Sequence, residues 1–173
     1  MANDALVVIA YQYDREADAL ADFEDLRTRY GKEEIGETFD AAVLTRKANG
    51  KVDIVKRAVG QTRHRAGVGL GTGLAVGAAL ALFPAISLAG ALVAGGTAGA
   101  SAGAVAGHLA SGISRSDLKD LGEVLDDGTS GLVVVAAANV ETMVVDATTR
   151  AKHRAKAQLQ ADVDAMKKDL AAI

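Results

Sequence analysis

Cysteine and tryptophan are absent from the chain, proline occurs once, and aromatic residues make up only 3% of the composition. Without cysteine the chain has no disulfide, no thiolate nucleophile and no cysteine-based metal site, which fits a reducing cytoplasm. A net charge of −3 lacks the basic excess of nucleic-acid binders, so we expect no specific nucleic-acid partner. The first residues also lack the positive region and long apolar run of a secretory signal, so we expect the bulk of the chain to be cytoplasmic.

Charge is missing altogether from residues 66–107, which contain no Asp, Glu, Lys, Arg or His and hold most of the glycines. Two glycine ladders with a four-residue step flank the single proline: Gly69, Gly73 and Gly77, then Gly95, Gly99, Gly103 and Gly107. On a helix this step places the glycines on one stripe, where a second backbone can approach closely. We therefore predict a helical hairpin that turns at Phe83 and Pro84 and packs through these glycines.

The rest of the chain predicts an α+β fold. Residues 5–11 and 131–138 are continuous apolar runs, typical of strands buried on both faces. Residues 15–30 have helical periodicity, and Asn49-Gly50 joins two further strands, 38–46 and 51–57, as a hairpin. Ser114 and Asp117 predict the start of a helix over 115–125. This βαββαβ order predicts a ferredoxin-like sheet with 5–11 and 131–138 side by side at its centre.

The last segment, from Glu141 to about Leu170, contains no proline or glycine and repeats apolar residues at three- and four-residue spacing. This pattern predicts a long amphipathic terminal helix. The expected organisation is therefore a discontinuous ferredoxin-like domain (1–62 and 112–138), a glycine-zipper helical hairpin (63–111) and the long C-terminal helix (139–173).

A cluster of cations in that last segment is a candidate contact for anionic lipid headgroups or for an acidic partner such as RNA. Its members are Arg150, Lys152, Arg154 and Lys156. The alternative is a solvated helix face balanced by nearby aspartates. Asp22, Glu24 and Asp25 are likewise interpreted as a solvated face of the first helix.

Topology limits how residues 66–107 could meet a membrane. If 5–11 and 131–138 pair in one sheet, the chain must enter and leave on the same side, so it crosses an even number of times or not at all. Each arm of the hairpin has about 17 to 23 residues, or roughly 25–35 Å at 1.5 Å per residue. A hydrocarbon core is roughly 30 Å thick. Lipid and the interior of a protein assembly both remain open as surroundings.

A family resemblance follows from these features together: the βαββ unit with Asn49-Gly50, a glycine-rich insert opening near Gly67, a short acidic helix and the strand GLVVVAAA at 131–138. The chain resembles, up to about Ala147, a bacterial family labelled domain of unknown function 1269. Its members are usually described as predicted membrane proteins. The resemblance implies a membrane protein and supplies no catalytic residues. Our leading expectation for the location is the inner membrane, with the main domain facing the cytoplasm.

Catalytic and cofactor motifs are missing from the sequence. Glycines 67, 69, 71 and 73 do not form G-x-G-x-x-G, and no phosphate-binding loop motif occurs. His64, His108 and His153 lack metal-ligand spacing, although the first two could meet at the base of the hairpin. We therefore expect no enzyme, no cofactor and no resident metal.

Three functional hypotheses follow. The first is a membrane-associated protein that self-associates through the glycine hairpin and carries a cytoplasmic interaction or sensing module. The second is a soluble, cytoplasmic homo-oligomer whose hairpins form a buried core. The third is a regulatory domain that binds a small ligand on its open sheet face.

Overall fold

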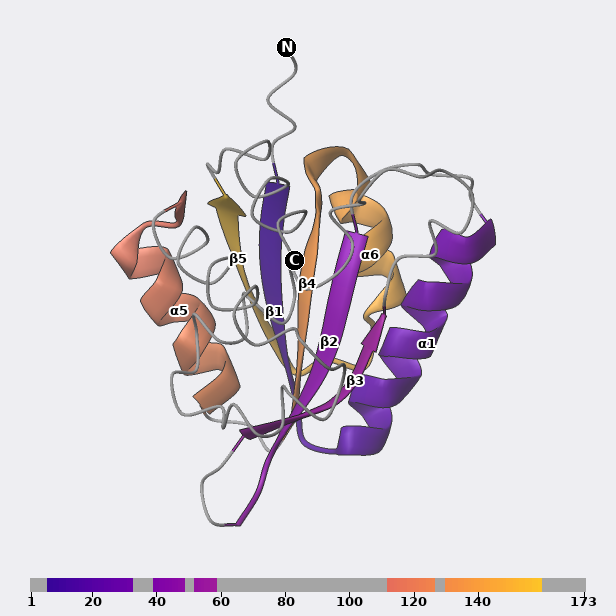
Figure 1. The fold of residues 1–173 in the computed structure, drawn as a ribbon, viewed down its shortest axis with the longest axis horizontal. Helices are drawn as coiled ribbons and strands as arrows, with labels where there is room; N and C mark the ends of the chain where they lie inside the picture. Colours follow the sequence, from indigo (N-terminus) through magenta and orange to yellow (C-terminus); the bar gives the residue numbers. More distant parts are fainter. Residues whose placement is uncertain (1–5, 33–38, 49–51, 59–111, 127–129, 160–173) are drawn as a thin grey trace, which may run out of the picture.

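The computed structural model describes residues 6–32, 39–48, 52–58, 112–126 and 130–159, and these form one five-stranded sheet with helices on both faces (Figure 1). Neighbouring strands are antiparallel and lie in the order β3-β2-β4-β1-β5. The elements in chain order are β1 (Leu6–Tyr13), α1 (Glu16–Lys32), β2 (Phe39–Arg46), β3 (Val52–Ala58), α5 (Arg115–Asp126), β4 (Ser130–Ala137), the 3-10 helix η1 (Ala138–Val140), α6 (Glu141–Ala147) and β5 (His153–Leu159).

β1 and β4 are neighbours in the interior of the sheet, with Val8 opposite Val135. All eight residues of each strand are buried, as expected for continuous apolar runs. The predicted pairing of these two strands is therefore confirmed.

The helices form two layers. α1 and α6 pack against each other on one face of the sheet, and α5 lies over β1 and β5 on the opposite face (Figure 1). Phe23 of α1 and Val144 of α6 meet Ile9 of β1 in one buried cluster. At the start of α5, the hydroxyl of Ser114 accepts a hydrogen bond from the Asp117 N–H at 3.1 Å. The predicted cap of this helix is confirmed.

The ferredoxin-like prediction is wrong. It would place the strand at 51–57 beside the first strand, but β3 lies at the sheet edge and pairs with β2. β1 is instead flanked by β4 and β5. The physical reason lies in side-chain polarity: Ala41–Leu44 of β2 are apolar and buried, whereas β3 carries three charged residues, which suit an edge strand: Asp53, Lys56 and Arg57. The hairpin of β2 and β3 does form, while Asn49-Gly50 lies outside the described residues.

The prediction of a long C-terminal helix is also wrong. α6 ends at Ala147, where the Thr148 hydroxyl donates to the carbonyls of Val144 and Val145, and β5 follows from His153. Alanines at 151, 155 and 157 are ambiguous, because the four-residue step from 151 to 155 fits a helix while the two-residue step from 155 to 157 fits a strand. The open edge of β1 decides between them, because strand pairing satisfies its backbone hydrogen-bonding groups.

Candidate functional site

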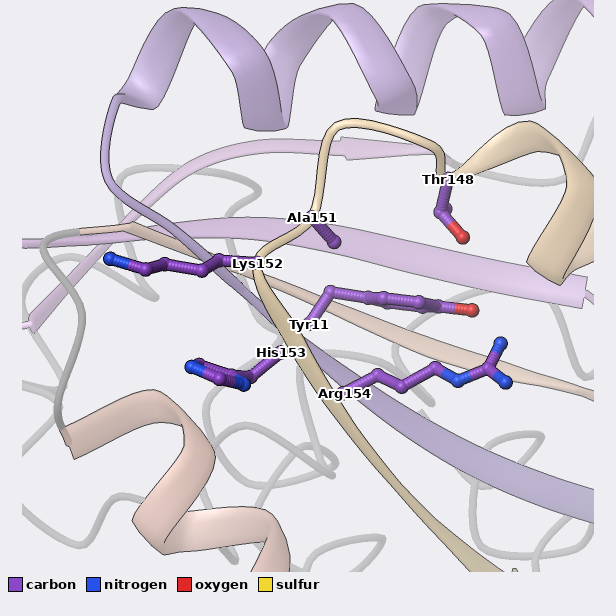
Figure 2. A pocket seen from close by; sticks show the side chains of 6 residues that line it. All are labelled: Tyr11, Thr148, Ala151, Lys152, His153 and Arg154. Atoms are coloured by element: carbon purple, nitrogen blue, oxygen red, sulfur yellow. The ribbon is translucent and has the colours of Figure 1, made fainter.

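A small cavity lies where the segment between α6 and β5 crosses over β1 (Figure 2). Its volume is about 250 Å³, and it is lined by Tyr11, Thr148, Ala151, Lys152, His153 and Arg154. The last three are exposed, whereas Tyr11 and Thr148 are buried. The cavity therefore has a polar, cationic mouth and two hydroxyl groups inside it.

Tyr11 reaches this cavity because of strand register. It lies opposite Arg154 of β5 and Leu132 of β4, so all three residues share the sheet face that carries α1 and α6. The Tyr11 side chain is only 1% exposed, yet its hydroxyl makes no hydrogen bond within the described structure. Burial raises the pKa of Tyr11, while the nearby Thr148 hydroxyl and the Arg154 charge act in the opposite direction. The phenol is therefore a neutral donor that makes no hydrogen bond of good geometry in the described structure.

Thr148 is held in place by the end of α6. Its hydroxyl hydrogen is directed to the carbonyl oxygen of Val144 at 2.9 Å, with that of Val145 at 3.2 Å. A hydroxyl that donates one hydrogen bond keeps its acceptor lone pairs. Thr148 thus ends the helix and also lines the cavity.

Three of the four cations predicted to meet an anionic surface pair with carboxylates. Arg150 contacts Asp22 and Asp25 at 2.6 and 2.7 Å. Lys152 lies 3.3 Å from Asp14, and Lys156 lies 2.7 Å from Glu141. These residues lie on β5 and the turn before it, and not on a helix. The structure does not bring the four together as one free patch.

Arg154 is the exception. In the described structure it has neither a hydrogen-bond partner nor an ion-pair partner. Figure 2 shows its guanidinium group at the same end of the cavity as the Tyr11 hydroxyl and the Thr148 side chain. The Lys152 and His153 side chains run toward the opposite end. An unpaired cation and an unpaired phenol therefore share one end of the cavity.

A second polar cluster, the Asp22 clamp, joins α1 to the same α6–β5 segment. Asp22 is completely buried and accepts hydrogen bonds from the Tyr13 hydroxyl at 2.9 Å, the Arg150 N–H at 3.0 Å and the Arg150 guanidinium at 2.6 Å. Burial, followed by the Asp22 charge, raises the pKa of Tyr13 well above its usual value. Hydrogen bonds to Asp25 and Asp22 raise the pKa of Arg150. The clamp fixes the segment that forms one wall of the cavity.

The interpretation of Asp22 as part of a solvated face was therefore wrong. A signal was present, because Asp22 shares the buried stripe of α1 with Ala19, Phe23 and Leu26 at helical spacing. A carboxylate in such a stripe needs buried donors. Tyr11 and Thr148 had no comparable signal, since their meeting depends on the unpredicted strand β5.

Several predicted features lie outside the described residues. They include both glycine ladders (Gly69, Gly73, Gly77, Gly95, Gly99, Gly103 and Gly107), the turn at Phe83 and Pro84, and His64 and His108. In the described parts of the chain there is no helix with the length and apolar character needed to cross a membrane. Those same parts contain no cluster of three or more side chains suited to holding a metal ion.

The fold is a mixed α+β sheet domain with a small cationic cavity at one sheet edge. Residues 66–171 match the family described as "Protein of unknown function (DUF1269)". This match spans more than half of the chain, so the chain belongs to that family. It runs past Ala147 and includes the segment that forms β5. The comparisons with curated proteins and with solved structures gave no significant match.

Proposed function

We propose that the protein is a non-enzymatic module that attaches to the inner membrane and self-associates through its glycine-rich hairpin, with the sheet domain facing the cytoplasm. The observation that carries the proposal is the position of β3 and β4 in one sheet, with β2 between them. Residues 59–111 connect the last residue of β3 to the region just before α5. If this segment inserts into a membrane, the chain therefore enters and leaves the membrane on the same side.

The sequence of the segment supplies the rest of the argument. Residues 66–107 carry no charged side chain, and their two glycine ladders keep a four-residue step on each side of Pro84. Small residues at this step favour close helix packing in lipid, where van der Waals contacts replace the hydrophobic effect as the driving force. In this proposal the stripe of glycines also packs one hairpin against the hairpin of another copy. The expected partner is therefore a second copy of the chain.

Cell fractionation followed by carbonate extraction tests the membrane attachment. We expect the full chain to stay in the membrane pellet after extraction at alkaline pH. Complete recovery in the soluble fraction as a monodisperse oligomer would refute the membrane attachment and support the soluble assembly instead.

Cysteine labelling tests the topology without background, because the chain has no cysteine of its own. Ala48→Cys, near the β2–β3 hairpin, and Ser116→Cys, in α5, both replace exposed residues. An impermeant maleimide should label neither variant in intact spheroplasts and both after lysis. Labelling of either position from outside would contradict the cytoplasmic orientation.

Substitution at a ladder glycine tests self-association. Gly99→Leu should separate the packed helices and lower the oligomer mass measured by light scattering. Ala100→Leu adds a comparable side chain one position away from the ladder and serves as the control. Equal masses for the two variants and the unmodified protein would contradict assembly through the glycines.

A further inference from the structure

We propose that the cavity between the α6–β5 segment and β1 is a binding site for a small phosphate group, held by Arg154 and Tyr11. This inference goes beyond the proposed function and does not depend on membrane attachment, since both residues lie in the sheet domain. Four observations carry it: the cavity, the unpartnered Tyr11 hydroxyl, the unpaired Arg154 and the pairing of the surrounding charges.

The Tyr11 hydroxyl is the first part of the argument. A buried hydroxyl without a hydrogen bond costs free energy, so most such groups in folded proteins have a partner. Tyr11 is 1% exposed, lines the cavity and makes no hydrogen bond in the described structure. It is a donor that an oxygen acceptor in the cavity would satisfy.

Arg154 supplies the charge and the geometry. A guanidinium group presents several N–H donors in a planar fork that matches two oxygens of one phosphate or carboxylate. The corresponding cations beside it already have partners: Lys152 pairs with Asp14 and Lys156 with Glu141. Arg154 has none in the described structure and points to the Tyr11 end of the cavity (Figure 2).

The charges around the site favour an anion over a cation. Glu141 and Asp22 are the carboxylates whose charges act on Tyr11. Glu141 is held by Lys156 at 2.7 Å, and Asp22 is held by Arg150 at 2.6 Å. With both carboxylates neutralised, Arg154 is the remaining charge beside the phenol, while the Lys152 and His153 side chains run toward the opposite end of the cavity. A cavity of about 250 Å³ suits a small group. We assign this group as phosphate, because a phosphate offers oxygens to both the Arg154 guanidinium and the Tyr11 hydroxyl.

The experiment measures thermal stabilisation of the purified full chain by inorganic phosphate, with sodium chloride at matched ionic strength as the reference. Ligands that bind only the folded state raise the unfolding temperature in a saturable way. We expect saturable stabilisation by phosphate, and 31P NMR line broadening at the same concentrations. A phosphate response equal to that of chloride would overturn the proposal.

Three variants distinguish this site from general charge effects. Arg154→Gln should weaken phosphate binding about tenfold or more, since a charge-assisted bidentate contact is lost. Lys152→Gln is the matched control, because this neighbouring cation pairs with Asp14 and points away, and it should change the affinity little. Equal weakening by both variants would show a diffuse charge effect and overturn the site.

Tyr11→Phe gives the sharpest result, because its two effects have opposite signs. Without phosphate the variant should be at least as stable as the unmodified protein, since it removes only an unsatisfied hydroxyl. Its stabilisation by phosphate should nevertheless be reduced severalfold. A variant that loses stability in phosphate-free buffer but keeps the full phosphate response would overturn the role of the phenol.

Vesicles distinguish the source of the phosphate group. Phosphatidylcholine vesicles with and without phosphatidic acid are compared by flotation. Binding that requires phosphatidic acid and is lost in Arg154→Gln would assign the site to a lipid headgroup. A response to inorganic phosphate alone would assign it to a soluble phosphate. Absence of both responses would refute the site.

Discussion

Replacement of Asp22 with alanine should produce one of the largest stability losses available to a polar residue in this protein. Asp22 is completely buried and accepts three hydrogen bonds from two separate segments, β1 and the turn before β5. A carboxylate in this position is stable only because donors surround it. Its removal takes this acceptor away from the Tyr13 hydroxyl and the Arg150 peptide N–H, whereas the Arg150 guanidinium keeps its contact with Asp25.

The magnitude follows from the individual groups. The buried Tyr13 hydroxyl loses its acceptor, at a cost of about 1–3 kcal/mol, and the part-buried peptide N–H of residue 150 adds about 0.5–1.5 kcal/mol. The expected loss is therefore about 2–4 kcal/mol, a large fraction of the roughly 5–15 kcal/mol that stabilises a typical domain. Asp22→Asn should cost less, because its amide oxygen can still accept from Tyr13 and the peptide N–H.

Urea unfolding followed by far-ultraviolet circular dichroism measures this loss. Asp25→Ala is the matched control, since Asp25 contacts the same Arg150 at 2.7 Å but is 52% exposed, and exposed pairs contribute little. A double-mutant cycle with Tyr13→Phe isolates the contact: the double variant should lose about 1–2 kcal/mol less than the sum of the single variants. Equal losses for Asp22→Ala and Asp25→Ala, or purely additive effects with Tyr13→Phe, would refute the clamp.

Two further predictions concern pH and the last strand. Because the folded protein keeps the proton of Tyr13 where the unfolded chain releases it, stability should fall above pH 10, by about 1.4 kcal/mol per pH unit for each such tyrosine. Urea unfolding between pH 9 and 11 should show a smaller slope in Tyr13→Phe; an unchanged slope contradicts the assignment. Ala157→Asp should destabilise by about 2 kcal/mol or more, since Ala157 is 3% exposed in β5. Gln158→Asp, at an exposed neighbour, should have little effect, and the reverse order would contradict the strand.

The elements that the sequence predicted well carry their signal in adjacent residues. The apolar runs at 5–11 and 131–138 became β1 and β4, and Ser114 caps α5 as its spacing indicated. The two strands around Asn49-Gly50 also pair as expected. In each case a short stretch contains the whole pattern, so no knowledge of distant partners was needed.

The elements that were missed depend on partners far away in the chain. Alanines at 151 and 155 fit a helix, and only the open edge of β1 turns this segment into β5. The cavity could not be predicted for the same reason, because Tyr11 and Arg154 meet only through that strand pairing. Asp22 is different: its place in the stripe with Ala19 and Leu26 was visible, but a carboxylate among acidic neighbours was interpreted as solvated.

The position of β1 sets an order of events during synthesis. It is the first strand of the sheet to be made, yet both of its neighbours, β4 and β5, follow the 59–111 segment. All eight residues of β1 are buried in the folded sheet. β1 can therefore pair on both sides only after β5, the last strand, has been synthesised. Such distant pairings slow folding, and unpaired apolar strands invite aggregation. The glycine-rich segment therefore emerges from the ribosome before β4 and β5 are available to complete the sheet.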